Sequence, residues 1–196
     1  MNSWPKHLLL HLVVISLVLS SGCSSDDNTV EPGKRLCGGA SGLAARIAGI
    51  PGVSEICVSD DNTTVIYTPA GAGIPAGRYE TTSVFKADSV TIEVSTMFYA
   101  HDGGSTPLDV TGNRAEAEFN PDGFWFSYRE TKTGDYDVIS TTVTGAATLT
   151  FNELTIAVLS FVNLEISLVD AAAPSTDAGT RRISEGYLNV TVDSAP

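Results

Sequence analysis

The sequence predicts an all-β domain, an antiparallel β-sandwich or barrel-like fold with one short N-terminal helix. Three observations support this prediction. Apolar and polar residues alternate with a period of two in several segments, most clearly in residues 90–98. Turn-forming stretches such as Asn120-Pro121-Asp122-Gly123 separate these segments. Residues 138–169 contain many β-branched side chains, one glycine and no proline, which favours strands.

The short helix is expected to begin at Ser41, whose side chain can cap the first turn. Leu43 and Ile47 lie four residues apart, which places them on one face of a helix. Gly49, followed by Pro51, is a typical helix end. A small amphipathic helix is therefore expected before the first strand.

The strands are expected to follow one another with short turns between them. Ile56 and Val58 alternate with polar neighbours, and Asp60-Asp61-Asn62 forms a turn before the next strand. Residues 154–169 are nearly continuously apolar and are expected to form long central strands joined near Ser160. Further strands are expected around residues 65–67, 79–85, 90–98, 115–119, 124–128, 138–151 and 188–192.

The first residues have the layout of a secretory signal peptide. Lys6 precedes an apolar run, Leu8–Leu19, and three small residues, Ser20-Ser21-Gly22, lead to Cys23. The run has about a dozen residues, whereas a membrane-spanning helix needs roughly 20. Residues 1–22 are therefore expected to be removed on export.

A flexible tether and one domain are expected to follow the signal peptide. Residues 23–35 are rich in Ser, Asp, Glu, Pro and Gly and offer almost nothing to bury. Residues 36–196 are long and apolar enough to form a single β domain with its own core.

The end of the signal peptide, Leu19-Ser20-Ser21-Gly22-Cys23, resembles the lipobox of bacterial lipoproteins. In that family the cysteine receives a diacylglycerol and the chain is cut before it. The resemblance implies that Cys23 is lipidated and becomes the first residue of the mature protein. It also implies an outer-membrane location, facing the periplasm or the cell surface, because Ser24 is not an aspartate. The alternative is an ordinary signal peptide with a chance cysteine.

The closing segment, residues 183–190, resembles small all-β lipoproteins of Gram-negative envelopes, most of them uncharacterised. This resemblance covers the C-terminal third at best and rests on no specific motif. It implies a fold class and nothing catalytic.

The cysteine count predicts one disulfide. The chain has three cysteines, and once Cys23 is assigned to the lipid, Cys37 and Cys57 remain as a pair. An exported protein lies in an oxidising compartment, where such a pair is expected to be bridged. Two free thiols are the alternative.

The charge of the chain excludes some partners. Eleven Lys and Arg residues face 23 Asp and Glu residues, a net charge of −12 at neutral pH. Nucleic-acid binding depends on Lys and Arg that contact phosphate, so no nucleic-acid partner is expected. Without its lipid, the chain is not expected to bind an anionic membrane surface either.

No catalytic residue, cofactor or metal is expected. His101 is the single histidine after the signal peptide, so a Ser-His-Asp triad or a zinc site would depend on it. Asp60-Asp61-Asn62 and Asp102 could offer oxygen ligands to calcium but lack EF-hand spacing. The pair Glu116/Glu118 could do acid–base work but is more often a solvated face. An envelope hydrolase is the minor alternative.

The aromatic strand Phe124-Trp125-Phe126-Ser127-Tyr128 gives the best functional indication. In a strand, Trp125 lies on the face opposite Tyr128, and an exposed Trp can stack against a sugar. Trp125 and Tyr128 are the candidate ligand contacts. The leading hypothesis is a non-enzymatic binding module for a glycan or an envelope protein. The alternative is a structural or assembly partner in the outer membrane, with long sheet edges within residues 148–169.

Overall fold

The computed structural model describes residues 36–39, 42–71, 74, 76–101, 104–132, 137–152 and 156–191. These residues belong to one compact unit, Glu31–Pro196. The predictions for the signal peptide, Cys23 and the tether fall outside the described residues. Within the described ranges, no helix combines the length and the apolar character needed to cross a membrane.

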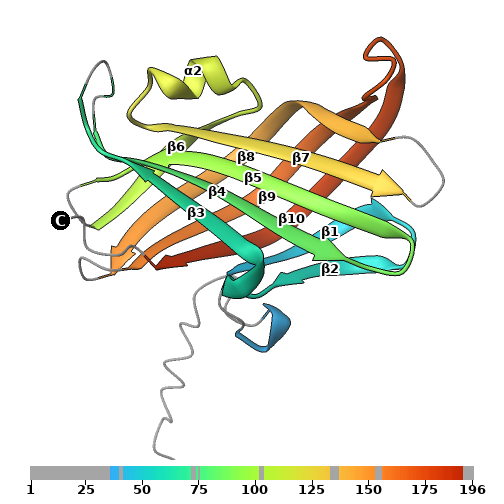
Figure 1. The fold of residues 1–196 in the computed structure, drawn as a ribbon, viewed down its shortest axis with the longest axis horizontal. Coiled ribbons are helices and arrows are strands. Elements are labelled where there is room, and N and C mark those ends of the chain that lie inside the picture. The colour runs from blue at the N-terminus through green and yellow to red at the C-terminus, as the bar shows by residue number, and fades with distance from the viewer. Residues whose placement is uncertain are drawn as a thin grey trace, which may run out of the picture. The chain divides into compact units, whose positions relative to one another are not determined.

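The prediction of an all-β fold is confirmed (Figure 1). The elements in chain order are η1 (Leu36–Gly39), β1 (Leu43–Ile50), β2 (Val53–Val58), η2 (Asp60–Asn62), β3 (Thr63–Thr68), β4 (Arg78–Lys86), β5 (Val90–Tyr99), β6 (Gly104–Thr111), α2 (Arg114–Glu118), β7 (Gly123–Lys132), β8 (Val138–Asn152), β9 (Ile156–Asp170) and β10 (Asp177–Thr191). The ten described strands form one sheet, not the two sheets of a sandwich.

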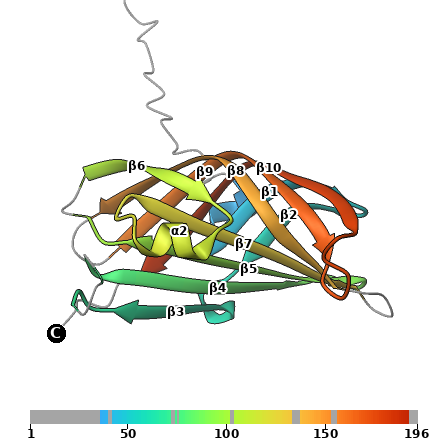
Figure 2. The same cartoon turned by 90° about the horizontal axis from the view of Figure 1, so that it is seen from above.

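The strand order is β2-β1-β10-β9-β8-β6-β7-β5-β4-β3, and β8 also pairs with β7. All pairs are antiparallel except β6 with β7, which run parallel. Figure 2 shows β3 to β5 on one side of the curled sheet and β8 to β10 on the other. The sheet does not close, because β2 and β3 lie at its two ends.

The described residues of the segment 148–169 (148–152 and 156–169) form no sheet edge, contrary to the expectation for an assembly partner. β9 pairs with β10 on one side and with β8 on the other, and β8 pairs in turn with β6 and β7. β9 also continues through Ser160 without a turn. Its one irregularity is Asn163, with a φ of 52°, at a register shift beside Gly145. Asn tolerates this left-handed conformation, so the strand bends there and continues.

The expected N-terminal helix is wrong, because Leu43–Ile50 is strand β1. A spacing of four residues fits one face of a helix and also one face of a strand, since four is a multiple of two. Leu43, Ala45 and Ile47 all point into the core. Pairing with β10 on one side and β2 on the other favours the strand.

The expected strand at residues 115–119 is also wrong, since Arg114–Glu118 forms the short helix α2. The Asn113 side chain accepts a hydrogen bond from the Ala115 N–H at 3.1 Å and caps the first turn. Only Ala117 of this helix is buried, whereas Ala115 and Phe119 are exposed, so the alternation with the glutamates here does not mark a buried strand face.

The core lies against the inner face of the sheet and takes buried side chains from every described strand except β3. The alternation in residues 90–98 is confirmed, because Val90, Ile92, Val94 and Phe98 are buried there. β3 lies outside this core: Val65, Ile66 and Tyr67 are 39%, 57% and 39% exposed.

One ion pair is buried within the core. Glu130 of β7 is 0% exposed and Arg181 of β10 is 8% exposed. The Arg181 Nη2 donates to Glu130 Oε2 at 2.9 Å, and Arg181 Nε donates to Glu130 Oε1. The Tyr128 hydroxyl also donates to Glu130 Oε1, at 2.8 Å. The carboxylate therefore connects β7 to β10, which have three strands between them in the sheet order.

Candidate binding site

A cleft of about 510 Å³ lies where the sheet stays open. It is named the edge cleft here and is lined by residues of β2, η2, β3 and β4: Cys57, Val58, Asp61, Asn62, Thr64, Thr82, Val84, Phe85 and Lys86. Sites for small ligands usually measure about 300–1,000 Å³. The edge cleft is therefore large enough for a sugar unit or a short peptide.

The edge cleft exists because β4 is longer than β3. The β3–β4 ladder ends at the pair Thr63↔Ser83, so Val84–Lys86 continue without β3 beside them. The chain turns away at η2, where the Asn62 N–H donates to the Ser59 carbonyl oxygen at 3.0 Å. β2 comes within 8 Å of β4 between Cα atoms but forms no ladder with it.

The backbone of β4 also faces the edge cleft. In an antiparallel ladder, the N–H and C=O of alternate residues point to opposite sides of the strand. The Ala87 N–H donates to the Val90 carbonyl oxygen at 2.9 Å, so the odd-numbered residues of β4 are the ones whose main-chain groups bond to β5. By alternation, the main-chain groups of Val84 and Lys86 point away from β5, toward the cleft.

The side chains around the edge cleft combine polar and apolar groups. Asp61, Asn62 and Lys86 are exposed and offer a carboxylate, an amide and an ammonium group. Val84 and Phe85 are half-buried and provide apolar surface. This set of donors and acceptors around an apolar wall suits non-covalent recognition.

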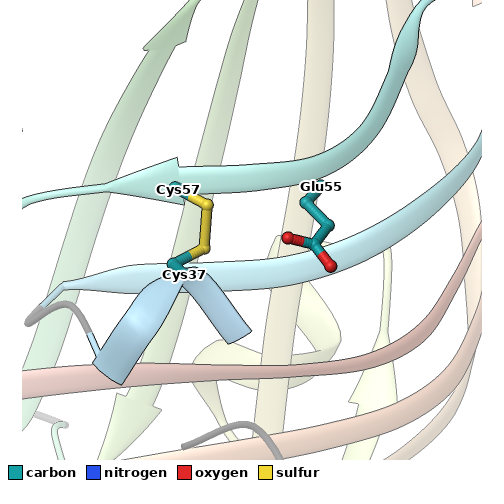
Figure 3. Close-up of side chains that lie close together, drawn as sticks. All are labelled: Cys37, Glu55 and Cys57. Atoms are coloured by element: carbon teal, nitrogen blue, oxygen red, sulfur yellow. A yellow bond between two sulfur atoms is a disulfide. The ribbon is translucent and has the colours of Figure 1, made fainter. Parts of the chain in front are cut away.

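The predicted disulfide is present: Cys37 of η1 is joined to Cys57 of β2, with their Cα atoms 5.6 Å apart (Figure 3). It holds η1 on the outer face of the sheet, where Leu36 packs against Ala44 and Tyr187. Because Cys57 also lines the edge cleft, the disulfide fixes one wall of it.

The carboxylate of Glu55 lies beside this disulfide, and its oxygen and the two sulfurs lie within 4.8 Å of one another (Figure 3). Sulfurs joined in a disulfide offer no thiolate to a metal ion. The Glu55 Oε1 is also paired with Arg46 Nη2 at 3.4 Å. The cluster is therefore a cross-link next to a surface ion pair.

Trp125 lies on the outer face of β7 and is half-buried. Its Nε1 donates to the Gly112 carbonyl oxygen at 3.2 Å. The guanidinium carbon of Arg114 lies 5.1 Å from its ring centroid, and Arg114 also pairs with Glu80 at 2.7 Å. The hollow beside the ring measures about 90 Å³, which is too small for a sugar ring. Arg114 thus covers the surface on which a sugar would stack.

Tyr128 does not fit the expected role of ligand contact, because it is 0% exposed. It lies on the inner face of β7, as the period of two predicts, and its hydroxyl is bonded to Glu130. Burial, and after it the Glu130 carboxylate, raise the pKa of Tyr128 above its usual value. A ligand at the outer face cannot reach both Trp125 and Tyr128.

The other acidic candidates already have partners or lie apart. Glu118 pairs with Arg78 at 2.8 Å, and Glu116 accepts a hydrogen bond from the Thr111 hydroxyl at 2.9 Å. Asp60 and Asp61 are exposed in η2, whereas Asp102 lies outside the described residues.

Sequence reasoning did not single out Thr82 and Val84 of the edge cleft. Their only shared signal in the sequence is alternate spacing on one strand. Comparison with protein-family models, curated proteins and solved structures finds no match to this chain. A functional proposal therefore rests on the sequence and on the geometry of the described residues.

Proposed function

We propose that this chain is a lipid-anchored, non-enzymatic binding protein of the cell envelope, and that the edge cleft receives a glycan. The single observation behind this proposal is the 510 Å³ cleft with polar side chains around an apolar wall. A sugar has hydroxyl groups that donate and accept, and C–H faces that pack on apolar side chains. Both features find counterparts in the edge cleft.

The location in the envelope is supported by the sequence. The lipobox-like segment that ends at Cys23 precedes an acidic tether, which can hold the domain away from the membrane surface. Two or three acyl chains hold a protein firmly at a membrane, whereas one does not. We place the protein at the outer membrane, facing the periplasm or the cell surface.

The barrel-like arrangement belongs to this proposal. We infer that the sheet curls around one core and stays open between β2 and β3, so that the opening serves as the binding site. The Cys37–Cys57 disulfide supports this view, because it stiffens the β2 side of the opening.

Filling the edge cleft tests the proposal. The purified mature chain is screened against an array of envelope and extracellular glycans, and hits are confirmed by titration calorimetry. In Val84→Trp, the new ring obstructs the cleft, and we expect at least about tenfold weaker binding. Thr131→Trp is the control, since Thr131 is exposed on β7 away from the cleft.

Equal binding by both variants would show that the ligand lies elsewhere. A peptide that binds with the same dependence on Val84 would keep the cleft as the site and change the ligand to a protein. If neither a glycan nor a peptide binds, the proposal is wrong.

A separate experiment tests the anchor. Mass spectrometry of the protein extracted from membranes should find a diacylglyceryl group on residue 23 and no residues before it. Cys23→Ala should leave the protein unlipidated and release it from the membrane fraction. Retention of residues 1–22 in the wild-type protein would contradict this part of the proposal.

A further inference from the structure

We propose that β3 is a self-pairing edge: a second copy of the chain adds to it in antiparallel orientation, with Val65 of each copy opposite the other. This inference does not depend on the edge cleft or on the lipid anchor. It assigns the assembly role to β3 instead of residues 148–169.

The free edge of β3 presents main-chain groups at alternate residues. Among the described residues, β3 pairs only with β4. The Ala100 N–H donates to the Gly77 carbonyl oxygen at 2.7 Å, so odd-numbered β4 residues bond to β5 and even-numbered ones to β3. The β3 partners of those even-numbered residues include Ile66. The N–H and C=O groups of Val65 and Tyr67 and the C=O of Thr63 therefore point outward, whereas the Thr63 N–H donates to the Asp60 carbonyl oxygen within the same copy.

This edge carries none of the features that usually prevent strand addition. Protective edges have charged side chains, prolines or bulges. β3 reads Thr-Thr-Val-Ile-Tyr-Thr and has no charge and no proline, and its pairing with β4 is regular. Val65, Ile66 and Tyr67 are more than a third exposed on both faces of the strand. A neutral, β-branched and aromatic edge of this kind favours another strand.

The sequence of β3 selects one register. A two-fold axis through Val65 sets Val65 opposite Val65 of the second copy, and Thr63 opposite Tyr67. The N–H of Val65 then donates to the C=O of Val65 in the second copy, and the N–H of Tyr67 donates to the C=O of Thr63 in the second copy. A centre at Ile66 would instead set Thr63 opposite Pro69, which has no N–H to donate.

Charge does not oppose a second copy in this register. The chain carries a net charge of −12, so copies repel wherever acidic surfaces meet. With Val65 at the centre, the η2 acids Asp60 and Asp61 of the two copies lie beyond opposite ends of the paired strands. The two Thr63 residues, which follow η2, are already roughly 13 Å apart at about 3.3 Å per residue, beyond the Debye length of about 8 Å. A parallel pairing would bring these acids together.

Charge pairs at the two-fold centre test the proposal. In the full mature chain extracted in detergent, native mass spectrometry should find dimers whose fraction rises with concentration. Val65→Lys and Val65→Asp each place two like charges opposite one another and should weaken the dimer about tenfold or more. Mixing the two variants should restore a dimer that contains one copy of each. A residue meets itself only at the centre, so this recovery is specific to the proposed register.

Val162 provides the matched control, because it is 38% exposed, close to Val65, but lies on β9 within the sheet. Val162→Lys and Val162→Asp should leave the dimer unchanged. Hydrogen exchange of the wild-type chain gives a second readout that needs no variant. The amides of Val65 and Tyr67 should gain protection with concentration, whereas those of Thr63 and Ile66, which are already bonded within one copy, should not change.

A wild-type chain that stays monomeric at every soluble concentration would overturn the inference. A dimer that survives both Val65 variants would overturn it too, since that dimer would use another surface. Concentration-dependent protection at other amides, without protection at Val65 and Tyr67, would have the same meaning.

Discussion

Removing the charge of Glu130 should destabilise the fold strongly. Glu130→Gln keeps the shape of the side chain but leaves Arg181 charged and only 8% exposed, without its carboxylate. The amide of Gln keeps one acceptor oxygen, so one of the two hydrogen bonds from Arg181 is lost and the other no longer joins opposite charges, each change costing about 1 kcal/mol or more. The unpaired buried charge adds its desolvation cost, for a total of about 3–5 kcal/mol. This is a large part of the 5–15 kcal/mol by which most domains are stable.

Urea unfolding followed by the fluorescence of Trp125 measures this loss. The double variant Glu130→Leu/Arg181→Met removes both charges and should recover at least about 2 kcal/mol relative to Glu130→Gln. As a surface control, Glu185→Gln removes an exposed partner of Arg46 and should cost less than about 1 kcal/mol. A cost below about 1 kcal/mol for Glu130→Gln, or no recovery in the double variant, would refute this reasoning.

Three other perturbations have defined outcomes. Burial raises the pKa of Tyr128 in the folded state, so the contribution of its protonated hydroxyl to the free energy of unfolding is complete below the unfolded pKa of about 10. Above that pH the free energy of unfolding should fall by up to about 1.4 kcal/mol per pH unit. Urea titrations at several pH values should show a smaller slope for Tyr128→Phe. Replacing both Cys37 and Cys57 by Ala should cost about 3 kcal/mol, because the disulfide closes a loop with a sequence separation of 20; dithiothreitol should lower wild-type stability similarly and leave the variant unchanged. Gly186→Ala would place a Cβ 2.2 Å from the ring of Phe161 and should cost about 1–3 kcal/mol in thermal unfolding, whereas Gly52→Ala meets no atom within 4 Å and its cost reflects only backbone strain.

Local pattern predicted which face of a strand is buried, because that property depends on alternation alone. Phe124, Phe126 and Tyr128 are buried and Trp125 is not, as the period of two requires. The same pattern failed at Leu43 and Ile47, where a spacing of four fits a helix and a strand equally well. Pairing on both sides, which is a property of the whole sheet, decided the outcome.

Strand order could not be predicted, because it depends on contacts between residues far apart in the sequence. The apolar run of β9 indicates burial but not which strands lie on either side of it. For the same reason, the edge cleft arises from the unequal lengths of β3 and β4, which no single segment reveals. Trp125 was a reasonable candidate on local grounds, but Arg114 from another element covers its ring.

The disulfide also determines how mechanical load enters the domain. Any pull on the chain from before Leu36 reaches Cys37 first and passes through the sulfur–sulfur bond to Cys57. The covalent path then bypasses residues 38–56, which include all of β1. In the proposed lipid-anchored form, tension would therefore be delivered to the end of β2, and β1 would carry no load until that bond is reduced.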